Sequence, residues 1–323
     1  MKKKIKILAT LGPKSLNKKF LKFAKKNNIT YLRLNMSHIN VKNLSKIIKF
    51  IRKYNTQTPI CIDTEGAQIR TKVKSKKLIK KNRIFNLFKN KKSFKLYPDD
   101  VFDKLKKKDI LSIGFDNLKA VIIKKTKNTC ILRSISSGLL ESNKGVHLEN
   151  RKIKLNYLTK KDLQAIEIGK MCKINNYALS FTNSHKDVKN FKKKLITENK
   201  IYKIETLSAI KDLKKILRYG DNFLIDRGDL SKETEIHKIP FYQRKIIKES
   251  KKLKGKQVFV ATNLLESMIM NDYPTRAEAN DIYNCLELGS SGLVLAAETA
   301  IGNYPENSIL FLKKMIKEFY KKN

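Results

Sequence analysis

Tryptophan is absent from the 323-residue sequence, and cysteine occurs only four times. Cys61, Cys130, Cys172 and Cys285 are scattered without the short spacing of a zinc site, and we expect them to stay reduced. No segment approaches the roughly 18 consecutive apolar residues that a membrane-spanning helix needs. The basic start of the chain lacks the apolar stretch and the cleavage site of a signal peptide. These absences predict a cytoplasmic protein without a membrane partner.

Acidic residues are also scarce, because 29 Asp and Glu face 72 Lys and Arg, which gives a formal net charge of +43. The lysines are spread along the whole chain, whereas nucleic-acid-binding proteins usually gather basic residues on one face beside stacking aromatic residues. The composition therefore argues against a nucleic-acid partner and indicates a solvated basic surface. Its field would draw anionic substrates towards the protein.

Eight short apolar segments recur along the chain, and amphipathic segments typical of helices follow most of them. Alternation of this kind predicts a parallel sheet with helices outside it. Eight repeats predict a closed (β/α)₈ barrel, the TIM-barrel architecture, with 306–322 as its last helix. The expected strands are 4–12, 31–37, 59–66, 177–182, 200–206, 222–228, 257–263 and 292–299.

One connection is much longer than the others. It lies between the third strand and the helix expected over 158–171, and it contains strand-like segments such as LKAVIIKK and TCILRSIS. A connection of this length needs structure of its own. We therefore expect a barrel domain formed by residues 1–70 and 151–323, with a small β-rich lid domain, 71–150, inserted after strand 3.

The carboxyl ends of the strands form the reactive face of such a barrel. Lys203 and Glu205 are two positions apart on one expected strand, so both side chains should point into the barrel. A buried lysine and a buried glutamate are costly unless they are paired or bound to a ligand. This pair therefore indicates a functional site.

The next strand ends in the stretch NFLIDRGDL, residues 222–230, which carries two carboxylates. Glu205 and Asp229 would leave adjacent strands, and their hard oxygen ligands suit Mg²⁺ (or Mn²⁺) better than zinc. We expect the flexible Gly228 to hold Asp229 outwards, whereas Asp226 could equally cap the loop. The alternative is that the acids form salt bridges with Lys203 and Arg227.

Polar residues also alternate on the second strand, where Arg33, Asn35 and Ser37 should face one way. With Asp63 they offer oxygens for a second, larger cation, and Arg33 offers a fork for a phosphoryl or carboxylate group. Two cation sites, an arginine and a lysine are what phosphoryl transfer requires, because its catalysis consists mainly of positioning and charge neutralisation.

A set of sequence motifs runs in order along both barrel segments. The motifs are TLGPKS (10–15), YLRLNMSH (31–38), IDTEGAQIRT (62–71), ALSFTNSHKDV (178–188), KIET (203–206), RGDL (227–230), ATNLLESMIMNDYPTRAEANDI (261–282) and LAAETAIGNYP (295–305). The most specific part is the ATNLLESM and PTRAEA stretch followed by ETA-x-G-x-YP. Together these motifs resemble the pyruvate kinase family, and the insertion matches only loosely.

The resemblance implies a glycolytic phosphotransferase that converts phosphoenolpyruvate and ADP into pyruvate and ATP. By this resemblance, Lys203 would neutralise the transferring phosphoryl group and Arg33 would contact it. Thr262 would belong to the end of the site that delivers a proton. Glu298 would have a supporting or relay role near the site. The implied cation ligands are Glu205 and Asp229 for Mg²⁺, and Asn35, Ser37, Asp63 and Thr64 for K⁺. The implied contacts to substrate and nucleotide are His38, Arg70, Lys144, Gly228 and Asp229.

The chain departs from the family pattern at several positions. The family's DTKGPEIRTG reads DTEGAQIRTK, so Glu65 places an anion where the family has a lysine. In the family, glutamate at the position of Gln68 accompanies K⁺ dependence and lysine accompanies its absence, so the K⁺ requirement is left open. Because the sequence stops at the eighth expected helix, we expect the family's regulatory C-terminal domain to be missing. Any homo-oligomer would then use barrel surfaces.

Two other functions remain open at the sequence level. One is a different Mg²⁺-dependent reaction, either a barrel lyase or aldolase acting on an oxo acid or phosphoryl transfer to another acceptor. The other is a non-catalytic homologue that acts as a binding module. The second is disfavoured because the charged interior residues, which are costly to bury, have all been retained.

Overall fold

The computed structural model describes residues 4–91, 93–114 and 118–322, which form two compact units. One unit, the barrel unit, comprises residues 1–66 and 160–323, and the other, the inserted unit, comprises Ala67–Thr159. The borders of the inserted unit expected from the sequence lie after residues 70 and 150. The inserted unit therefore begins slightly earlier and ends slightly later than expected.

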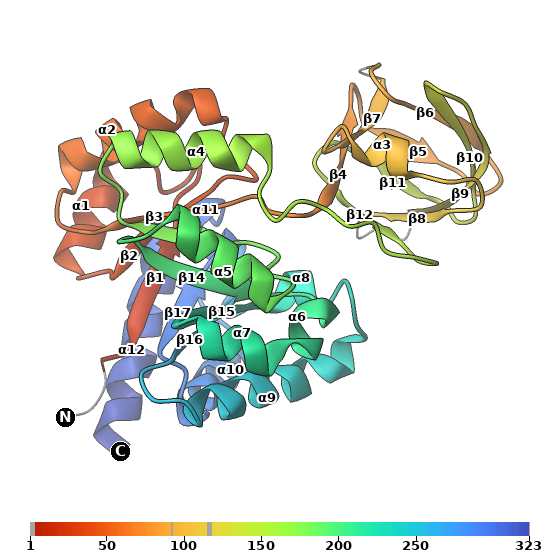
Figure 1. The fold of residues 1–323 in the computed structure, drawn as a ribbon. Coiled ribbons are helices and arrows are strands. Elements are labelled where there is room, and N and C mark those ends of the chain that lie inside the picture. The colour runs from red at the N-terminus through yellow and green to blue at the C-terminus, as the bar shows by residue number, and fades with distance from the viewer. Residues whose placement is uncertain (1–3, 92, 115–117, 323) are drawn as a thin grey trace. The chain divides into compact units, whose positions relative to one another are not determined.

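The barrel unit contains a closed barrel of parallel strands in the order β1-β17-β16-β15-β14-β13-β3-β2 (Figure 1). Lys203 pairs in register with Leu224 on the next strand, and Asn35 pairs with Asp63. The predicted (β/α)₈ barrel is confirmed. Its strands are β1 Lys6–Thr10, β2 Tyr31–Asn35, β3 Ile60–Asp63, β13 Asn176–Leu179, β14 Asn199–Ile204, β15 Asn222–Asp226, β16 Gln257–Ala261 and β17 Gly292–Leu295.

The interior of the barrel follows from the two-residue period of its strands. Every strand contributes to an apolar cluster in the centre, which consists of Leu8, Cys61, Ala178, Ile201, Leu224, Phe259, Ala261 and Val294 with Tyr31 packed against it. Two residues further along six of the strands, the interior positions become polar. These buried residues, named here the polar layer, are Thr10, Arg33, Asp63, Ser180, Lys203 and Asp226.

Helices cover the outside of the barrel, and side chains at their first turns help to fix where they begin. Asn17 Oδ1 accepts a hydrogen bond from Phe20 N at the start of α1, as an N-cap residue does. Ser184 and Thr275 form capping boxes at the starts of α5 and α10. None of the helices in the described residues is long and apolar enough to cross a membrane.

The bounds of the helices in the barrel unit are α1 Lys18–Lys26, η1 Val41–Asn43, α2 Leu44–Tyr54, α4 Lys160–Met171, α5 His185–Lys194, α6 Leu207–Lys211, α7 Leu213–Tyr219, α8 Arg227–Leu230, η2 Ile236–Lys238, α9 Ile239–Lys251, η3 Glu266–Ile269, α10 Arg276–Glu287, α11 Ala297–Ala300 and α12 Pro305–Lys322.

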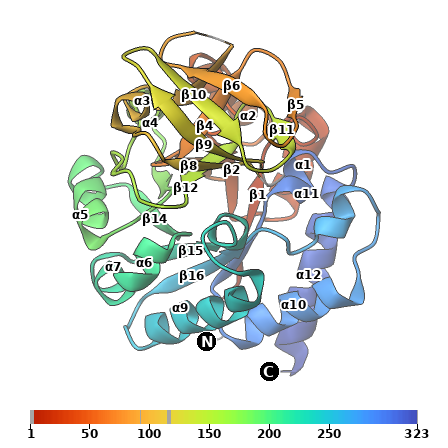
Figure 2. The same ribbon diagram turned by 90° about the vertical axis from the view of Figure 1, so that its right-hand side faces the viewer.

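The inserted unit is built on antiparallel strands (Figure 2). One sheet has the order β6-β10-β9-β8-β12-β4-β7, and β11 pairs with β5. An apolar core of its own, with Leu87, Leu111, Ile122 and Leu132 fully buried, stabilises the unit. Its elements are β4 Ile69–Val73, β5 Lys77–Ile79, β6 Ile84–Phe88, β7 Phe94–Tyr97, α3 Val101–Lys104, β8 Ile110–Ile113, β9 Leu118–Lys125, β10 Thr129–Ser134, β11 Gly138–Leu140 and β12 Gly145–Leu148.

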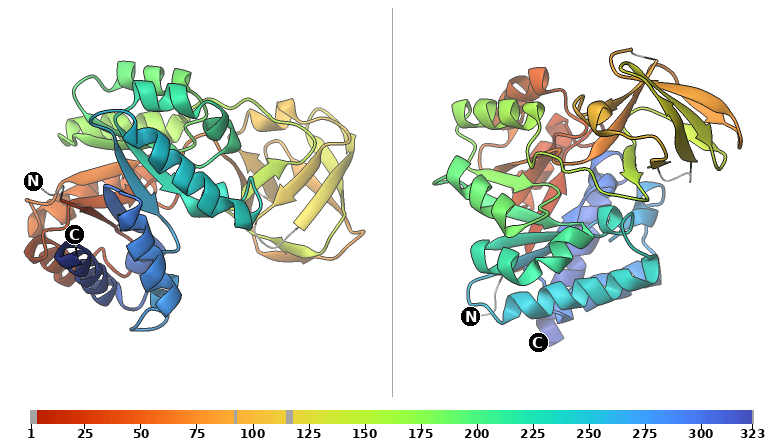
Figure 3. Two further views of the ribbon diagram at one scale, coloured as in Figure 1. Left: turned by 90° about the horizontal axis from the view of Figure 1, so that it is seen from below. Right: turned by 45° about the vertical axis from the view of Figure 1, so that its right-hand side comes forward.

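The two ends of the barrel unit meet where the barrel closes. The backbone N–H of Ile5 donates to Tyr320 Oη at 2.7 Å, so that β1 lies beside α12 (Figure 3). Parallel pairing of β1 with β17 completes the ring of strands. This closure holds the strand ends, and therefore the polar layer, in one fixed arrangement.

Candidate active site

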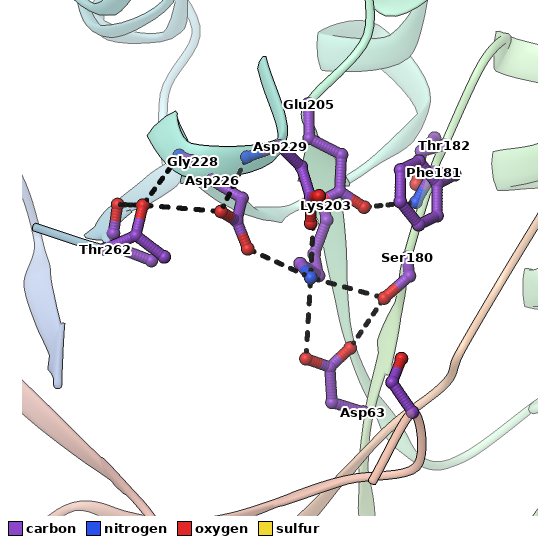
Figure 4. Close-up of polar contacts among 12 residues, drawn as sticks. Asp63, Ser180, Phe181, Thr182, Lys203, Glu205, Asp226, Gly228, Asp229 and Thr262 are labelled. Atoms are coloured by element: carbon purple, nitrogen blue, oxygen red, sulfur yellow. Dashed lines mark hydrogen bonds and ion pairs between the residues drawn. The ribbon is translucent and has the colours of Figure 1, made fainter. Parts of the chain in front are cut away.

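Lys203 occupies the centre of the polar layer (Figure 4). Its Nζ lies 3.1 Å from Glu205 Oε2, 3.2 Å from Asp226 Oδ2 and 3.6 Å from Asp63 Oδ2. It also donates to Ser180 Oγ at 3.3 Å. Burial alone would lower the pKa of Lys203, but the three carboxylates outweigh it and raise the pKa above its ordinary value. The side chain is therefore a buried ammonium group at neutral pH.

Three carboxylates from β14, β15 and the residues after them converge beside this lysine. One oxygen each from Glu205, Asp226 and Asp229 lies within 4.8 Å of the other two. Burial, together with Asp229 and Asp226, raises the pKa of Glu205 against the opposing effect of Lys203. Burial also opposes ionisation of Asp226, but Lys203 and Arg33 hold its pKa below the usual range. The cluster therefore carries more carboxylate groups than its neighbouring cations readily balance.

A strained backbone holds Glu205 in place. Phe181 has a φ of 51°, a left-handed conformation that is rare for a bulky residue, and its N–H donates to Glu205 Oε1. Strain of this kind persists only where the surrounding structure imposes it, and it is common at functional sites. The conformation orients one oxygen of Glu205 away from the carboxylate cluster.

Asp229 is presented by the one-turn helix α8 rather than by a flexible glycine. Gly228 lies inside this helix, so the expectation that Gly228 holds Asp229 outwards by its flexibility is wrong. The carboxylate of Asp229 pairs with Lys232, whereas Arg227 Nη1 turns to Asp281 at 2.6 Å. The salt-bridge alternative is therefore present for Lys203 but not for Arg227.

Arg33 is buried, and its donors are held by neighbouring barrel strands. Its Nε and Nη2 donate to Asp63 Oδ2 at 2.7 and 2.5 Å, and its Nη1 donates to Thr10 Oγ1 at 2.9 Å. Ser180 Oγ donates to the other oxygen of Asp63 at 3.0 Å. The arginine fork is thus fixed in the polar layer, and its contact with a phosphoryl group remains a prediction.

The expected K⁺ ligands lie at the ends of the adjacent strands β2 and β3. Asn35 Oδ1 accepts from Ser37 N at 3.0 Å, and Thr64 Oγ1 accepts from Ser180 N at 3.0 Å. Asp63, opposite Asn35 in the strand register, is completely buried. The structure therefore brings the four residues to one edge of the barrel, and their role as K⁺ ligands stays a prediction.

Thr262 and Glu298 act on the loop that follows β16. Thr262 Oγ1 accepts from Gly228 N at 2.8 Å, which joins this loop to α8. The buried carboxylate of Glu298 accepts from Leu265 N at 3.3 Å and from Ala296 N at 2.7 Å. Both oxygens of Glu298 are thus bound to backbone, which favours support of the loop over direct chemistry.

The expected nucleotide contacts are distributed over both units. His38 is exposed in the turn after β2, where its backbone N–H donates to the carbonyl of Asn35 at 3.1 Å. Arg70 and Lys144 belong to the inserted unit. There Arg70 Nη1 donates to Asn143 O at 3.4 Å, and Lys144 pairs with Glu141 at 3.0 Å. Their role in nucleotide binding stays a prediction.

Glu65, the acidic residue that replaces the family's lysine, is buried and paired. Lys161 Nζ lies 3.2 Å from its carboxylate and also donates to the carbonyl of Met36. The N–H groups of Glu65 and Gly66 donate to the carboxylate of Asp162 at 2.7 and 3.1 Å. The extra anion is therefore balanced by a lysine from α4.

Sequence reasoning gave too little weight to Ser180 and Asp226. Ser180 lies within an expected strand but was assigned no role, and Asp226 was left open because it could equally cap the loop. The signal was available, because each lies two positions after a residue that packs in the barrel centre, Ala178 or Leu224. The competing interpretation of Asp226 as a cap is also correct, since its Oδ1 accepts from Asp229 N at 3.3 Å.

Known proteins of one family are similar to this chain over most of its length. A family described as pyruvate kinase, barrel domain, matches residues 2–309. The pyruvate kinase of Thermotoga maritima is 31% identical over 98% of this chain and 71% of its own length. For that of Methanocaldococcus jannaschii the values are 34%, 98% and 70%, and for that of Thermoplasma acidophilum they are 29%, 97% and 57%. The chain thus spans little more than half of some relatives that it matches.

Proposed function

The chain belongs to the pyruvate kinase family, and we propose that it transfers the phosphoryl group of phosphoenolpyruvate to ADP, giving pyruvate and ATP. The observation that carries the proposal is the buried ammonium group of Lys203, held between carboxylates at the reactive end of the barrel. Phosphoryl transfer needs positioned positive charge more than a protein nucleophile. Lys203 supplies such a charge in a desolvated, fixed position.

The residues beside Lys203 fit a divalent cation. Their donor atoms are carboxylate oxygens that lie within 4.8 Å of one another, and Mg²⁺ and Mn²⁺ prefer hard oxygen ligands. Glu205 and Asp229 would hold the ion in this proposal. When bound, such an ion neutralises charge that develops on phosphoryl and enolate oxygens.

The protein groups would divide the remaining work as follows. Lys203 would balance the charge on the transferring phosphoryl group, and Arg33 would contact the same group. Thr262 would lie at the end of the substrate where the enolate is protonated. K⁺ would be held by Asn35, Ser37, Asp63 and Thr64, and the nucleotide and substrate would be contacted by His38, Arg70, Lys144 and Gly228.

A lyase or aldolase reaction, or transfer to another acceptor, was motivated by the acidic Glu65 and by the loose match of the inserted segment to the family. Because Lys161 balances Glu65, that residue no longer adds an uncompensated charge near anionic substrates. The pairing of Lys203 with three carboxylates also places charges in the barrel interior, where they are costly to bury. A module without chemistry has no reason to keep such charges. These observations favour the kinase reaction over the alternatives.

The proposal is tested by phosphorus NMR of the protein mixed with phosphoenolpyruvate, ADP, Mg²⁺ and K⁺. We expect the phosphoenolpyruvate signal to be replaced by the signals of ATP, with pyruvate formed in equal amount. Binding of phosphoenolpyruvate without turnover would indicate a different phosphoryl acceptor. Failure to bind either phosphoenolpyruvate or Mg²⁺ would indicate a non-catalytic homologue.

A further inference from the structure

Asp226 lies in the polar layer and uses its two oxygens differently. Oδ1 caps α8, where it accepts from Asp229 N and from Thr262 Oγ1, each at 3.3 Å. Oδ2 points towards Lys203 Nζ, 3.2 Å away (Figure 4). Capping therefore occupies only one oxygen. The other faces Lys203, whose Nζ also lies 3.1 Å from Glu205 Oε2.

A second observation concerns Glu205, which is completely buried. While its Oε1 accepts from Phe181 N, its Oε2 accepts no hydrogen bond within the described part of the chain. Its nearest cation is Lys203 Nζ at 3.1 Å, which makes an ion pair without the geometry of a hydrogen bond. A buried carboxylate oxygen left in this way is costly, and a bound cation would satisfy it.

We infer that Asp226 is a third carboxylate ligand, so that the divalent cation is held by Glu205, Asp226 and Asp229 together. The inference rests on the proposed function, which places the same ion on Glu205 and Asp229 alone. It follows from the place of the Asp226 carboxylate, one oxygen of which lies within 4.8 Å of an oxygen of Glu205 and an oxygen of Asp229.

With Asp226 as a ligand, the surroundings of Lys203 change when the ion binds. Without a divalent ion, its ammonium group is shared among Asp63, Glu205 and Asp226. An ion that takes over Glu205 and Asp226 leaves more of the lysine's charge for an anionic substrate.

The test separates the ligand role of Asp226 from its capping role. Asn and Ser are both good N-cap residues, so Asp226→Asn and Asp226→Ser keep an acceptor for Asp229 N but remove the negative charge. Mn²⁺ binding to the protein alone is measured by electron paramagnetic resonance, with Glu205→Gln and Asp229→Asn for comparison. Asp281→Asn, which removes a carboxylate paired with the first residue of α8, is the matched control.

We expect Asp226→Asn and Asp226→Ser to weaken Mn²⁺ binding at least about tenfold, while Asp281→Asn binds like the wild type. Wild-type Mn²⁺ binding in a folded Asp226 variant, with binding lost in Glu205→Gln and Asp229→Asn, would overturn the inference and leave the proposed function intact. Undiminished binding in all of these variants would overturn both placements of the ion. Thermal unfolding curves identify any variant that has not folded, and the second Asp226 substitution then decides.

Discussion

Lys203 combines a structural and a chemical role in one buried side chain, of which only 4% is exposed. It balances three carboxylates, so its removal leaves buried negative charges without a counterion. Breaking a buried ion pair from one side costs about 3–5 kcal/mol. The contribution of Lys203 to activity must therefore be measured with a substitution that keeps the positive charge.

We predict that Lys203→Arg keeps the fold but lowers kcat by about 100- to 1,000-fold, because the planar guanidinium cannot place its charge where the ammonium group lies. Lys203→Met should in addition lower the free energy of unfolding by about 3–5 kcal/mol. Pyruvate formation and urea unfolding check the two effects. The control is Lys192→Met, which breaks an ion pair between Lys192 on the outer helix α5 and Asp221. Wild-type kcat in Lys203→Arg would contradict the assigned role.

A second buried acid, Glu65, depends on Lys161 in the same way. We predict that Lys161→Met destabilises the protein by about 1–3 kcal/mol, because it removes the ammonium group of Lys161 from the buried Glu65 carboxylate and from the Met36 carbonyl. Adding Glu65→Gln to this variant should restore most of the loss. Urea unfolding of the two single variants and the double variant gives the interaction free energy. Strictly additive losses would show that the pair does not contribute.

At the residue scale, the sequence predicted the side chains that follow the two-residue period of a strand. Lys203 and Glu205 were expected to point inwards because they are two positions apart, and both are buried. The ion pair of Asp226 with Lys203 was not predicted, because a short polar turn explains an aspartate equally well. The left-handed backbone of Phe181 could not be predicted, since it goes against the local preference of a bulky residue.

At the scale of elements, a compact polar contact joins His185, the first residue of α5, to Asp212, the residue between α6 and α7. The carboxylate of Asp212 accepts from His185 N at 2.7 Å and lies 2.6 Å from His185 Nδ1. Burial opposes ionisation of Asp212, but its hydrogen bonds to His185 hold its pKa below the ordinary value of 3.8. The native protein therefore binds fewer protons at this carboxyl group than the unfolded chain does.

It follows that Asp212 stabilises the protein above pH 3.8 and that this stabilisation is lost as the pH falls through the lower native pKa. We predict that Asp212→Asn lowers the free energy of unfolding at neutral pH by about 1–2 kcal/mol and flattens its decline in acid. Urea unfolding between neutral and acidic pH measures both. Asp272→Asn, at an exposed loop position, is the control. An unchanged acid decline in Asp212→Asn would exclude this contribution.

The regular elements were predicted well because their side chains repeat. Each barrel strand falls within or close to its expected segment, and the amphipathic segment 306–322 corresponds to the long helix α12. The one-turn helices α8 and α11 were not predicted, because four residues are too few to show a helical period. Those short helices carry Asp229 and Glu298. The loop geometry of the site could therefore not be predicted from the sequence.

At the scale of the whole molecule, eight strand–helix repeats were enough to predict barrel closure, since a closed barrel is the usual way to bury eight parallel strands. The inserted unit was expected from the length of one connection alone. Its strand order could not be predicted, because antiparallel strands of similar composition can pair in many ways. For the same reason, fewer residues of that unit than of the barrel were predicted to contact the substrates.

The net charge of +43 gives a further prediction for the molecule as a whole. Its field should raise the rate at which anionic substrates reach the protein, and added salt should screen it. We expect kcat/KM for phosphoenolpyruvate to fall several-fold between about 0.02 M and 0.3 M ionic strength, with kcat little changed. Tetramethylammonium chloride at constant K⁺ separates screening from any specific K⁺ effect. A flat kcat/KM would show that the charge does not assist substrate capture.

The most direct test of the account is anomalous diffraction from crystals of the protein grown with Mn²⁺ and phosphoenolpyruvate. The account predicts a manganese peak in contact with the carboxylates of Glu205 and Asp229, and a phosphoryl group beside Lys203 Nζ. A manganese ion bound elsewhere, or a phosphoryl group remote from Lys203, would contradict it.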